Sequence, residues 1–116
     1  MKIGIYFKDY KWAKRYFNYL LETKDIVYTR ENNHSFFIQY ANKDTATFVI
    51  ANDSARGYKF DKMYLQDGID LDTYQCVIAP KLLHRQQINI PIQIIKEQDN
   101  NYLFIAADEY YGSKKD

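Results

Sequence analysis

The chain has 116 residues, of which 47% are hydrophobic and 17% aromatic, and its 16 basic and 15 acidic side chains leave a net charge of +1. This composition excludes an intrinsically disordered chain, and the length is that of one ordinary domain with its own core. The near-zero net charge excludes an overall electrostatic attraction to nucleic acid or to an anionic membrane, so any such binding would have to be local.

The first elements give the clearest pattern. Residues 3–7 are a short apolar run, as expected of a strand buried on both faces. After Asp9, a residue type that caps helices, apolar side chains recur at helical spacing at Ala13, Tyr16, Phe17 and Leu20. A β-branched run at 26–29 completes the order strand, helix, strand, which predicts a βαβ unit.

The middle of the chain predicts a hairpin followed by a strand and a helix. Residues 34–41 and 45–51 are β-prone runs joined by a turn-forming triplet. A strand is predicted over 62–66, and a helix over 71–79 that begins near Asp70 or Asp72 and ends before Pro80. The one cysteine, Cys76, lies in this apolar run and is expected to be buried; it cannot form an internal disulfide, which favours a reducing compartment.

The last third predicts a second hairpin, with strands over 88–96 and 102–107 around a polar turn. Pro91 lacks a backbone N–H and favours a sheet edge for the first of these strands. The predicted fold class is α/β, with α+β as the alternative. We expect one globular domain over residues 1–111, with a mixed sheet of five to seven strands and two main helices, and a frayed tail over 112–116.

One segment resembles a known family. The order of a strand, the helix WAKRYFNYL, a hairpin and then NDSARGYKFDKMYLQDGIDLDTYQCVIAPKL resembles the ATPase core of phage large terminases and related P-loop helicases, after their phosphate-binding loop. In that family a polar loop with Arg-Gly precedes an apolar strand ending in Asp-Glu, and a helix leading to a proline follows. Arg56, Gly57 and the strand KMYLQD match this order, and the resemblance covers residues 1–83.

The chain lacks the residues that carry out catalysis in that family. None of the four glycines is followed by Lys-Ser or Lys-Thr, and Gly68 follows Asp67 where a catalytic glutamate would stand. Phosphoryl transfer requires those groups to hold the phosphates and magnesium. The resemblance therefore implies a degenerate relative that kept the fold and lost the chemistry. We expect no enzymatic activity and no cofactor; a nucleotide-dependent enzyme is the least favoured alternative.

Four residues are predicted to bind a protein partner. Gly57 permits a turn that would direct Arg56 and Tyr58 outward at the end of the sheet, where α/β folds place functional loops. Pairing of Arg56 with a nearby carboxylate is the alternative, and it stays open. Tyr10 and Trp12 complete the set, because aromatic side chains are enriched at protein interfaces.

Basic side chains offer an alternative nucleic-acid site, although a solvated helix face is the favoured explanation for those on the first helix. The candidates are Lys8, Lys11, Lys14, Arg15, Lys81 and Arg85. The aspartates at 61, 67, 70 and 72 do not have the spacing of a calcium loop, so no metal site is predicted.

The function expected from these patterns is that of a non-enzymatic phage or mobile-element accessory protein. It would bind and modulate a protein partner, such as a repressor, a replication factor or a defence effector, in the cytoplasm of a bacterial host. The apolar run at the start of the chain is too short for a signal peptide or a membrane span. The identity of the partner and the formation of a homodimer stay open.

Overall fold

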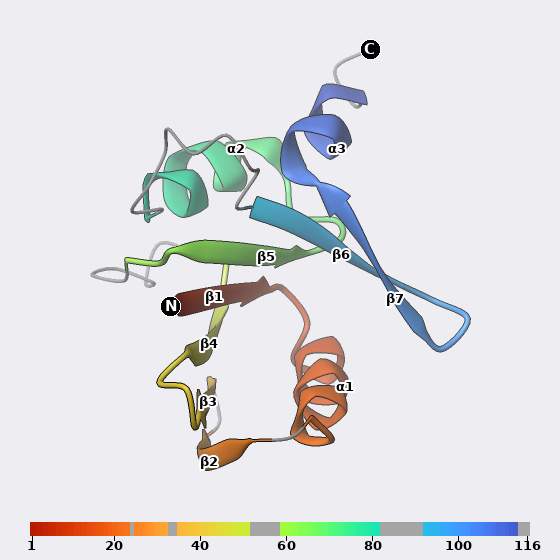
Figure 1. Ribbon diagram of the computed structural model, residues 1–116. Helices are drawn as coiled ribbons and strands as arrows, with labels where there is room; N and C mark the ends of the chain where they lie inside the picture. The colour runs from red at the N-terminus through yellow and green to blue at the C-terminus, as the bar shows by residue number, and fades with distance from the viewer. Residues whose placement is uncertain (24, 33–34, 52–58, 82–91, 114–116) are drawn as a thin grey trace.

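The computed structural model describes residues 1–23, 25–32, 35–51, 59–81 and 92–113. In chain order its elements are β1 (Lys2–Phe7), α1 (Tyr10–Leu21), β2 (Ile26–Glu31), β3 (Phe36–Tyr40), β4 (Thr45–Ile50), β5 (Lys62–Gln66), α2 (Leu71–Thr73), η1 (Tyr74–Ile78), η2 (Ala79–Lys81), β6 (Ile92–Gln98), β7 (Asn101–Ala106) and α3 (Ala107–Ser113). One seven-stranded sheet has the order β2-β3-β4-β1-β5-β6-β7 (Figure 1). Strands β4, β1, β5 and β6 are parallel, and antiparallel strands complete both sides. The predicted α/β class with a mixed sheet is confirmed.

β1 and α1 form where the sequence pattern places them. β1 lies at the centre of the sheet, and its last four residues are buried. Asp9 is the N-cap of α1, and its carboxylate accepts a hydrogen bond from the backbone N–H of Lys11 at 2.9 Å. The buried face of α1 consists of Trp12, Ala13, Tyr16 and Phe17.

The predicted strand after α1 exists, but it is not a neighbour of β1. The second strand of the predicted hairpin, β4, takes the place beside β1, and β3 follows it antiparallel. β2 therefore forms one edge of the sheet, with two strands between it and β1. All but the first of its residues are exposed, and its register with β3 shifts between Ile26 and Tyr28.

The helical segment over residues 71–81 (α2, η1 and η2) corrects two predictions. Pro80 does not end the segment, because it lies within the 3-10 turn of η2. In the same turn the ammonium of Lys81 donates a hydrogen bond to the carbonyl oxygen of Val77 at 2.6 Å. Cys76 is exposed rather than buried. Ile78 is the fully buried side chain of this segment and turns toward the sheet, which leaves Cys76 on the outer face.

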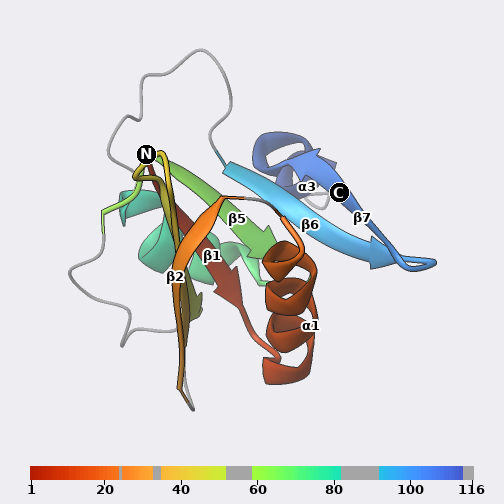
Figure 2. The same ribbon diagram turned by 60° about the horizontal axis from the view of Figure 1, so that its bottom comes forward.

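The second hairpin forms as predicted, but its first strand is not an edge. β6 begins at Ile92 and lies between β5 and β7. Pro91 itself lies outside the described residues. β7 forms the other edge of the sheet, and the hairpin extends away from the rest of the molecule (Figure 2). α3 was not predicted; it includes Gly112 and Ser113, which we assigned to the tail, whereas 114–116 lie outside the described ranges.

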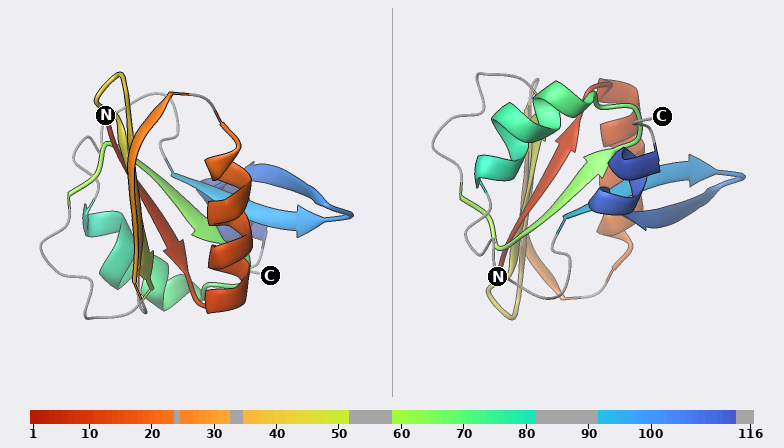
Figure 3. Two further views of the ribbon diagram at one scale, coloured as in Figure 1. Left: turned by 90° about the horizontal axis from the view of Figure 1, so that it is seen from below. Right: turned by 90° about the horizontal axis from the view of Figure 1, so that it is seen from above.

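The sheet separates two apolar cores. α1 packs on one face, and α3 and the segment over 71–81 pack on the other (Figure 3). Side chains of β1 alternate between the two cores, with Ile5 and Phe7 under α1 and Tyr6 on the opposite face. No helix in the described ranges is long and apolar enough to cross a membrane.

Candidate functional site

The carboxyl ends of β1 and β5 lie side by side, and the chain leaves them in opposite directions. From β1 it passes through α1 over one face of the sheet toward β2, and from β5 it passes through residues 71–81 over the other face toward β6. Such a topological switch point is where open α/β sheets bind their ligands. The side chains at this end of the sheet therefore form a candidate site.

Gln66 joins the two strands at this point. Its side-chain oxygen, Oε1, accepts hydrogen bonds from the backbone N–H groups of Lys8 at 2.7 Å and Asp9 at 3.2 Å. Gln66 is 8% exposed and is the one buried polar residue among the described residues. Its contacts satisfy two backbone donors where β1 turns into α1, and hold the end of β5 against that turn.

The turn after β5 is fixed by α3. The hydroxyl of Tyr110 donates to Asp67 at 2.5 Å and accepts from the backbone N–H of Gly68 at 3.1 Å. The ammonium of Lys8 donates to the carbonyl oxygen of Gly68 at 3.2 Å. Gly68 has φ +99°, a conformation that side chains with a Cβ rarely adopt, which explains a glycine at this position.

A hollow of about 310 Å³ opens beside Gln66. We call it the switch-point hollow; it is lined by Asp9, Trp12, Arg15, Gln66, Asp67, Ile95 and Glu97. Three of these side chains are carboxylates and one is a guanidinium, so the hollow is acidic on balance.

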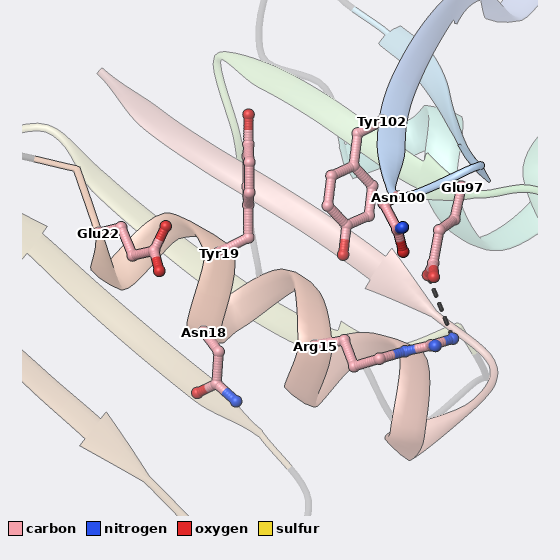
Figure 4. A pocket seen from close by; sticks show the side chains of 7 residues that line it. All are labelled: Arg15, Asn18, Tyr19, Glu22, Glu97, Asn100 and Tyr102. Carbon is pink, nitrogen blue, oxygen red and sulfur yellow. Dashed lines mark ion pairs between the residues drawn. The ribbon is translucent and has the colours of Figure 1, made fainter.

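A second hollow of about 300 Å³ lies between α1 and the β6–β7 hairpin. We call it the tyrosine hollow. As Figure 4 shows, α1 contributes Arg15, Asn18, Tyr19 and Glu22, and the hairpin contributes Glu97, Asn100 and Tyr102. The guanidinium of Arg15 lies 3.2 Å from the carboxylate of Glu97, and both residues line both hollows.

Tyrosine rings form one wall of the second hollow. The rings of Tyr19 and Tyr102 lie 4.8 Å apart, and Tyr16 lies 4.8 Å from Tyr102 and 5.9 Å from Tyr19. Burial raises the pKa of Tyr16 well above that of an ordinary phenol, and neighbouring tyrosines add to the effect. Burial likewise raises the pKa of Tyr102. Tyr19 and Tyr102, which line the hollow, present apolar rings with polar hydroxyl ends.

The residues predicted to bind a partner are not gathered in one place. Tyr10 is 45% exposed, with its ring 5.5 Å from that of Phe36. Trp12 is only 5% exposed and belongs to the core under α1, so it has little surface to offer a partner. Arg56 and Tyr58 lie outside the described residues.

The predicted basic face of α1 is divided by ion pairs. Lys14 pairs with Glu31 of β2, and Arg15 pairs with Glu97 of β6, so the two cations are drawn toward opposite sides of the helix. Lys11 is exposed. Lys8 and Lys81 both donate to carbonyl oxygens, as described above. Arg85 lies outside the described residues.

The aspartates of the predicted acidic cluster have separate structural contacts. Asp70 is the N-cap of α2 and accepts from the backbone N–H of Thr73, and Asp61 accepts from the backbone N–H of Lys2. Within the described ranges no three His, Cys, Asp or Glu side chains are placed to hold a metal ion.

Sequence reasoning missed Gln66, Glu97 and Tyr102, and it missed the exposed edge of the sheet. Of these features, only the exposed edge had a signal in the sequence. The run NYLFIA at 101–106 contains no charged residue and no proline, whereas edge strands usually contain one of these as protection against pairing. Comparison of the chain with protein-family models, with curated proteins and with solved structures gave no match.

Proposed function

We propose that this protein is a non-enzymatic interaction protein that binds a partner protein through the free edge of β7. The observation that carries this proposal is the chemistry of that edge. Its sequence, Asn101–Ala106, contains no charge, and Leu103 and Phe104 are 45% and 48% exposed on opposite faces. Soluble proteins protect such edges from adding another strand, because unpaired backbone groups form a template for pairing.

The opposite edge of the same sheet carries the usual protection. β2 includes Arg30 and Glu31, and its register with β3 is irregular near Ile26. A charged and distorted edge disfavours pairing with another chain. The contrast between the two edges supports β7, and not β2, as the surface that takes a partner strand.

The register of the hairpin identifies the backbone groups that are free. Gln98 pairs with Asn101 across a two-residue turn in which Asp99 and Asn100 both have positive φ. Hydrogen-bonded pairs alternate with open ones along an antiparallel ladder. Gln98 and Asn101 flank the two-residue turn and form a hydrogen-bonded pair, so the next hydrogen-bonded position on β7 is Leu103, whose backbone groups face β6. Those of Tyr102 and Phe104 face outward, where an added strand would meet them.

The tyrosine hollow adds side-chain contacts next to this edge. Tyr102 begins the free edge and also lines the hollow, together with Tyr19 and Arg15. Tyrosine and arginine are enriched among the residues that dominate the energy of protein interfaces. A strand paired with β7 would gain backbone hydrogen bonds from the edge and could place a side chain in the hollow.

The expected partners are those named from the sequence: a repressor, a replication factor or a defence effector of a bacterial host or of a competing element. The nucleic-acid alternative is less well supported, because Lys14 and Arg15 are each paired with a carboxylate.

The test compares the two edges directly. A photo-crosslinking amino acid is placed at position 104 or, as the matched control, at position 27, where Val27 is 60% exposed on the protected edge. We expect a discrete protein adduct from position 104 in bacterial lysate, insensitive to nuclease and high salt, and no such adduct from position 27. Phe104→Lys should abolish capture of the identified partner, whereas Val27→Lys should retain it.

Three results would contradict the proposal. Equal adducts from both positions would show that the edges do not differ. Loss of the adduct after nuclease treatment would favour nucleic acid. A doubled mass in light scattering, with position 104 crosslinked to a second copy of the chain, would assign the edge to self-association.

A further inference from the structure

The sheet has an open face over β2, β3 and the first half of β4, on the side opposite α1. The apolar core on that side takes side chains from the other strands and from the end of β4, and none from β2 or β3 within the described ranges. Burial along β3 alternates, because Phe36 and Ile38 are buried under α1 while Phe37 and Gln39 are partly exposed. One side of these strands is therefore core, and the other is accessible to solvent.

Six side chains lie on the open face, in two rows that the strand register sets. The first row is Arg30, Phe37 and Thr47, and the second is Tyr28, Gln39 and Thr45. Neighbouring strands are about 4.8 Å apart and alternate residues about 7 Å apart, so the two rows cover about 10 Å by 7 Å of sheet. The ring of Phe60 packs where a Cβ of Gly4 would be, and it closes the open face on the β1 side.

Aromatic rings and a guanidinium group form the centre of the open face. The ring of Tyr28, which is 50% exposed, lies 6.2 Å from the ring of Phe37, and the guanidinium of Arg30 lies 5.6 Å from the centre of the same ring. Arg30 is exposed and forms no ion pair in the described part of the chain. Its neighbour Glu31 is on the opposite face of β2, where it pairs with Lys14. The charge of Arg30 is therefore available to an anion.

A second cation stands at the opposite corner of the open face. Lys2 is paired with Thr45 in the strand register and is exposed, and its ammonium group likewise has no ion pair among the described residues. Two nearby carboxylates have other contacts: Asp44 pairs with the amino terminus at 2.7 Å, and Asp61 accepts from the backbone N–H of Lys2 at 2.8 Å. Two cations thus flank a surface of uncharged aromatic and polar side chains.

From this arrangement we infer that the open face binds single-stranded nucleic acid. Bases would stack on the rings of Tyr28 and Phe37, and the phosphates would contact Arg30 and Lys2. An exposed sheet face with aromatic side chains can stack two or three bases of a single strand, and the dimensions of the open face suit about two. A duplex is excluded, because its bases already stack on one another. This inference is independent of the proposed function, which uses the edge of β7 at the other side of the sheet.

The experiment measures the fluorescence anisotropy of labelled oligonucleotides titrated with the whole chain at low salt. The probes are oligothymidine and oligouridine of about eight nucleotides, a length within the range that single domains bind. A sugar-phosphate chain of the same length without bases, and a duplex of the same length, are the matched controls. We expect saturable binding of a single strand that weakens with added salt, and binding of the chain without bases that is weaker by at least about tenfold.

Variants on two surfaces test the assigned roles. Tyr28→Ser and Arg30→Gln should each weaken binding of the single strand by about fivefold or more, and Arg30→Gln should also reduce the slope of log affinity against log salt by about 0.7. Tyr10→Ser and Lys11→Gln are the matched controls on α1, where Tyr10 is 45% exposed, and they should bind as the wild type does. Phe37→Leu retains apolar packing and removes the aromatic ring, so it should also weaken binding. Urea unfolding establishes that each variant folds.

Several results would overturn the inference. Equal affinity for the chain without bases, or for the duplex, would mean that the rings do not stack on bases. Binding that is unchanged in Tyr28→Ser and Arg30→Gln, or lost equally in Tyr10→Ser and Lys11→Gln, would place the nucleic acid elsewhere. Displacement of the single strand by a neutral oligosaccharide would assign the rings to sugar binding. No saturable binding of either single strand at low salt would remove the site altogether.

Discussion

The guanidinium of Arg15 on α1 lies 3.2 Å from the carboxylate of Glu97 on β6, at the boundary between the switch-point hollow and the tyrosine hollow. The contact joins the first helix to the last hairpin. The side chain of Arg15 is 64% exposed and that of Glu97 is 24% exposed, so solvent screens the attraction.

We expect this ion pair to contribute little to stability. In a double-mutant cycle with Arg15→Ala and Glu97→Gln, the coupling free energy of unfolding should be about 0.2–1 kcal/mol and should decrease with added salt. Urea unfolding at low and high salt measures it. A salt-independent coupling above about 2 kcal/mol would mean that the pair is desolvated in solution.

Gly4 is required by the close approach of a ring. A Cβ at this position would lie 2.5 Å from the ring of Phe60, which is itself 3% exposed. Gly4→Ala should therefore destabilise the fold by about 1–3 kcal/mol through overpacking. Gly112→Ala is the matched control, because its Cβ would meet nothing within 4 Å and the residue lies in α3; it should stabilise the fold by about 0.5–1 kcal/mol. Equal effects in chemical denaturation would contradict this account of Gly4.

Gln66 should contribute to stability through its oxygen. Gln66→Leu leaves the backbone N–H groups of Lys8 and Asp9 without an acceptor and should cost about 1–3 kcal/mol of unfolding free energy. Gln66→Glu retains the acceptor and should cost less, although it adds a charge near Asp67. Equilibrium unfolding of the two variants compares them. A Leu variant as stable as the wild type would refute the role of Gln66 in joining β1 to β5.

Stability should fall at alkaline pH. Burial raises the pKa of Tyr16 and of Tyr111 above the ordinary phenol value of 10.0. A raised pKa in the folded state means that the unfolded chain loses its protons first. The contribution is therefore fully present below about pH 10 and is lost as the pH rises further. We expect a constant unfolding free energy up to about pH 10 and a decrease of roughly 1.4 kcal/mol per pH unit for each such group above it.

Phenylalanine variants isolate these groups. Tyr16→Phe should reduce the alkaline slope of the unfolding free energy, and the double variant with Tyr111→Phe should reduce it further. The absolute stability of the double variant also changes, because Tyr111 donates to the carbonyl oxygen of Ile69 at 3.0 Å. The slope against pH is therefore the informative quantity, and a slope unaffected by both substitutions would mean that other groups cause the alkaline loss.

Local features of the sequence determined most of the elements. The apolar run of residues 3–7, the cap at Asp9 and the spacing of Ala13, Tyr16 and Phe17 predicted β1 and α1, and the strand over 62–66 was predicted with the bounds it has. These predictions depend on a helix-capping residue and on the spacing of apolar side chains over a few residues, and both can be read directly from the sequence. The helix α3 was missed because its short, aromatic-rich segment gives a weak helical signal and forms against the sheet.

The candidate sites were decided by tertiary structure. Trp12 belongs to the core because the apolar stripe of α1 is wide enough to include it, and Cys76 is exposed because Ile78 takes the inward position. The contacts of Gln66 with the end of β1, of Tyr110 with Asp67 and of Arg15 with Glu97 join residues far apart in the chain. The order of strands determines which ends meet and which edges stay free. That order follows from the packing of both faces of the sheet at once, which no local pattern encodes.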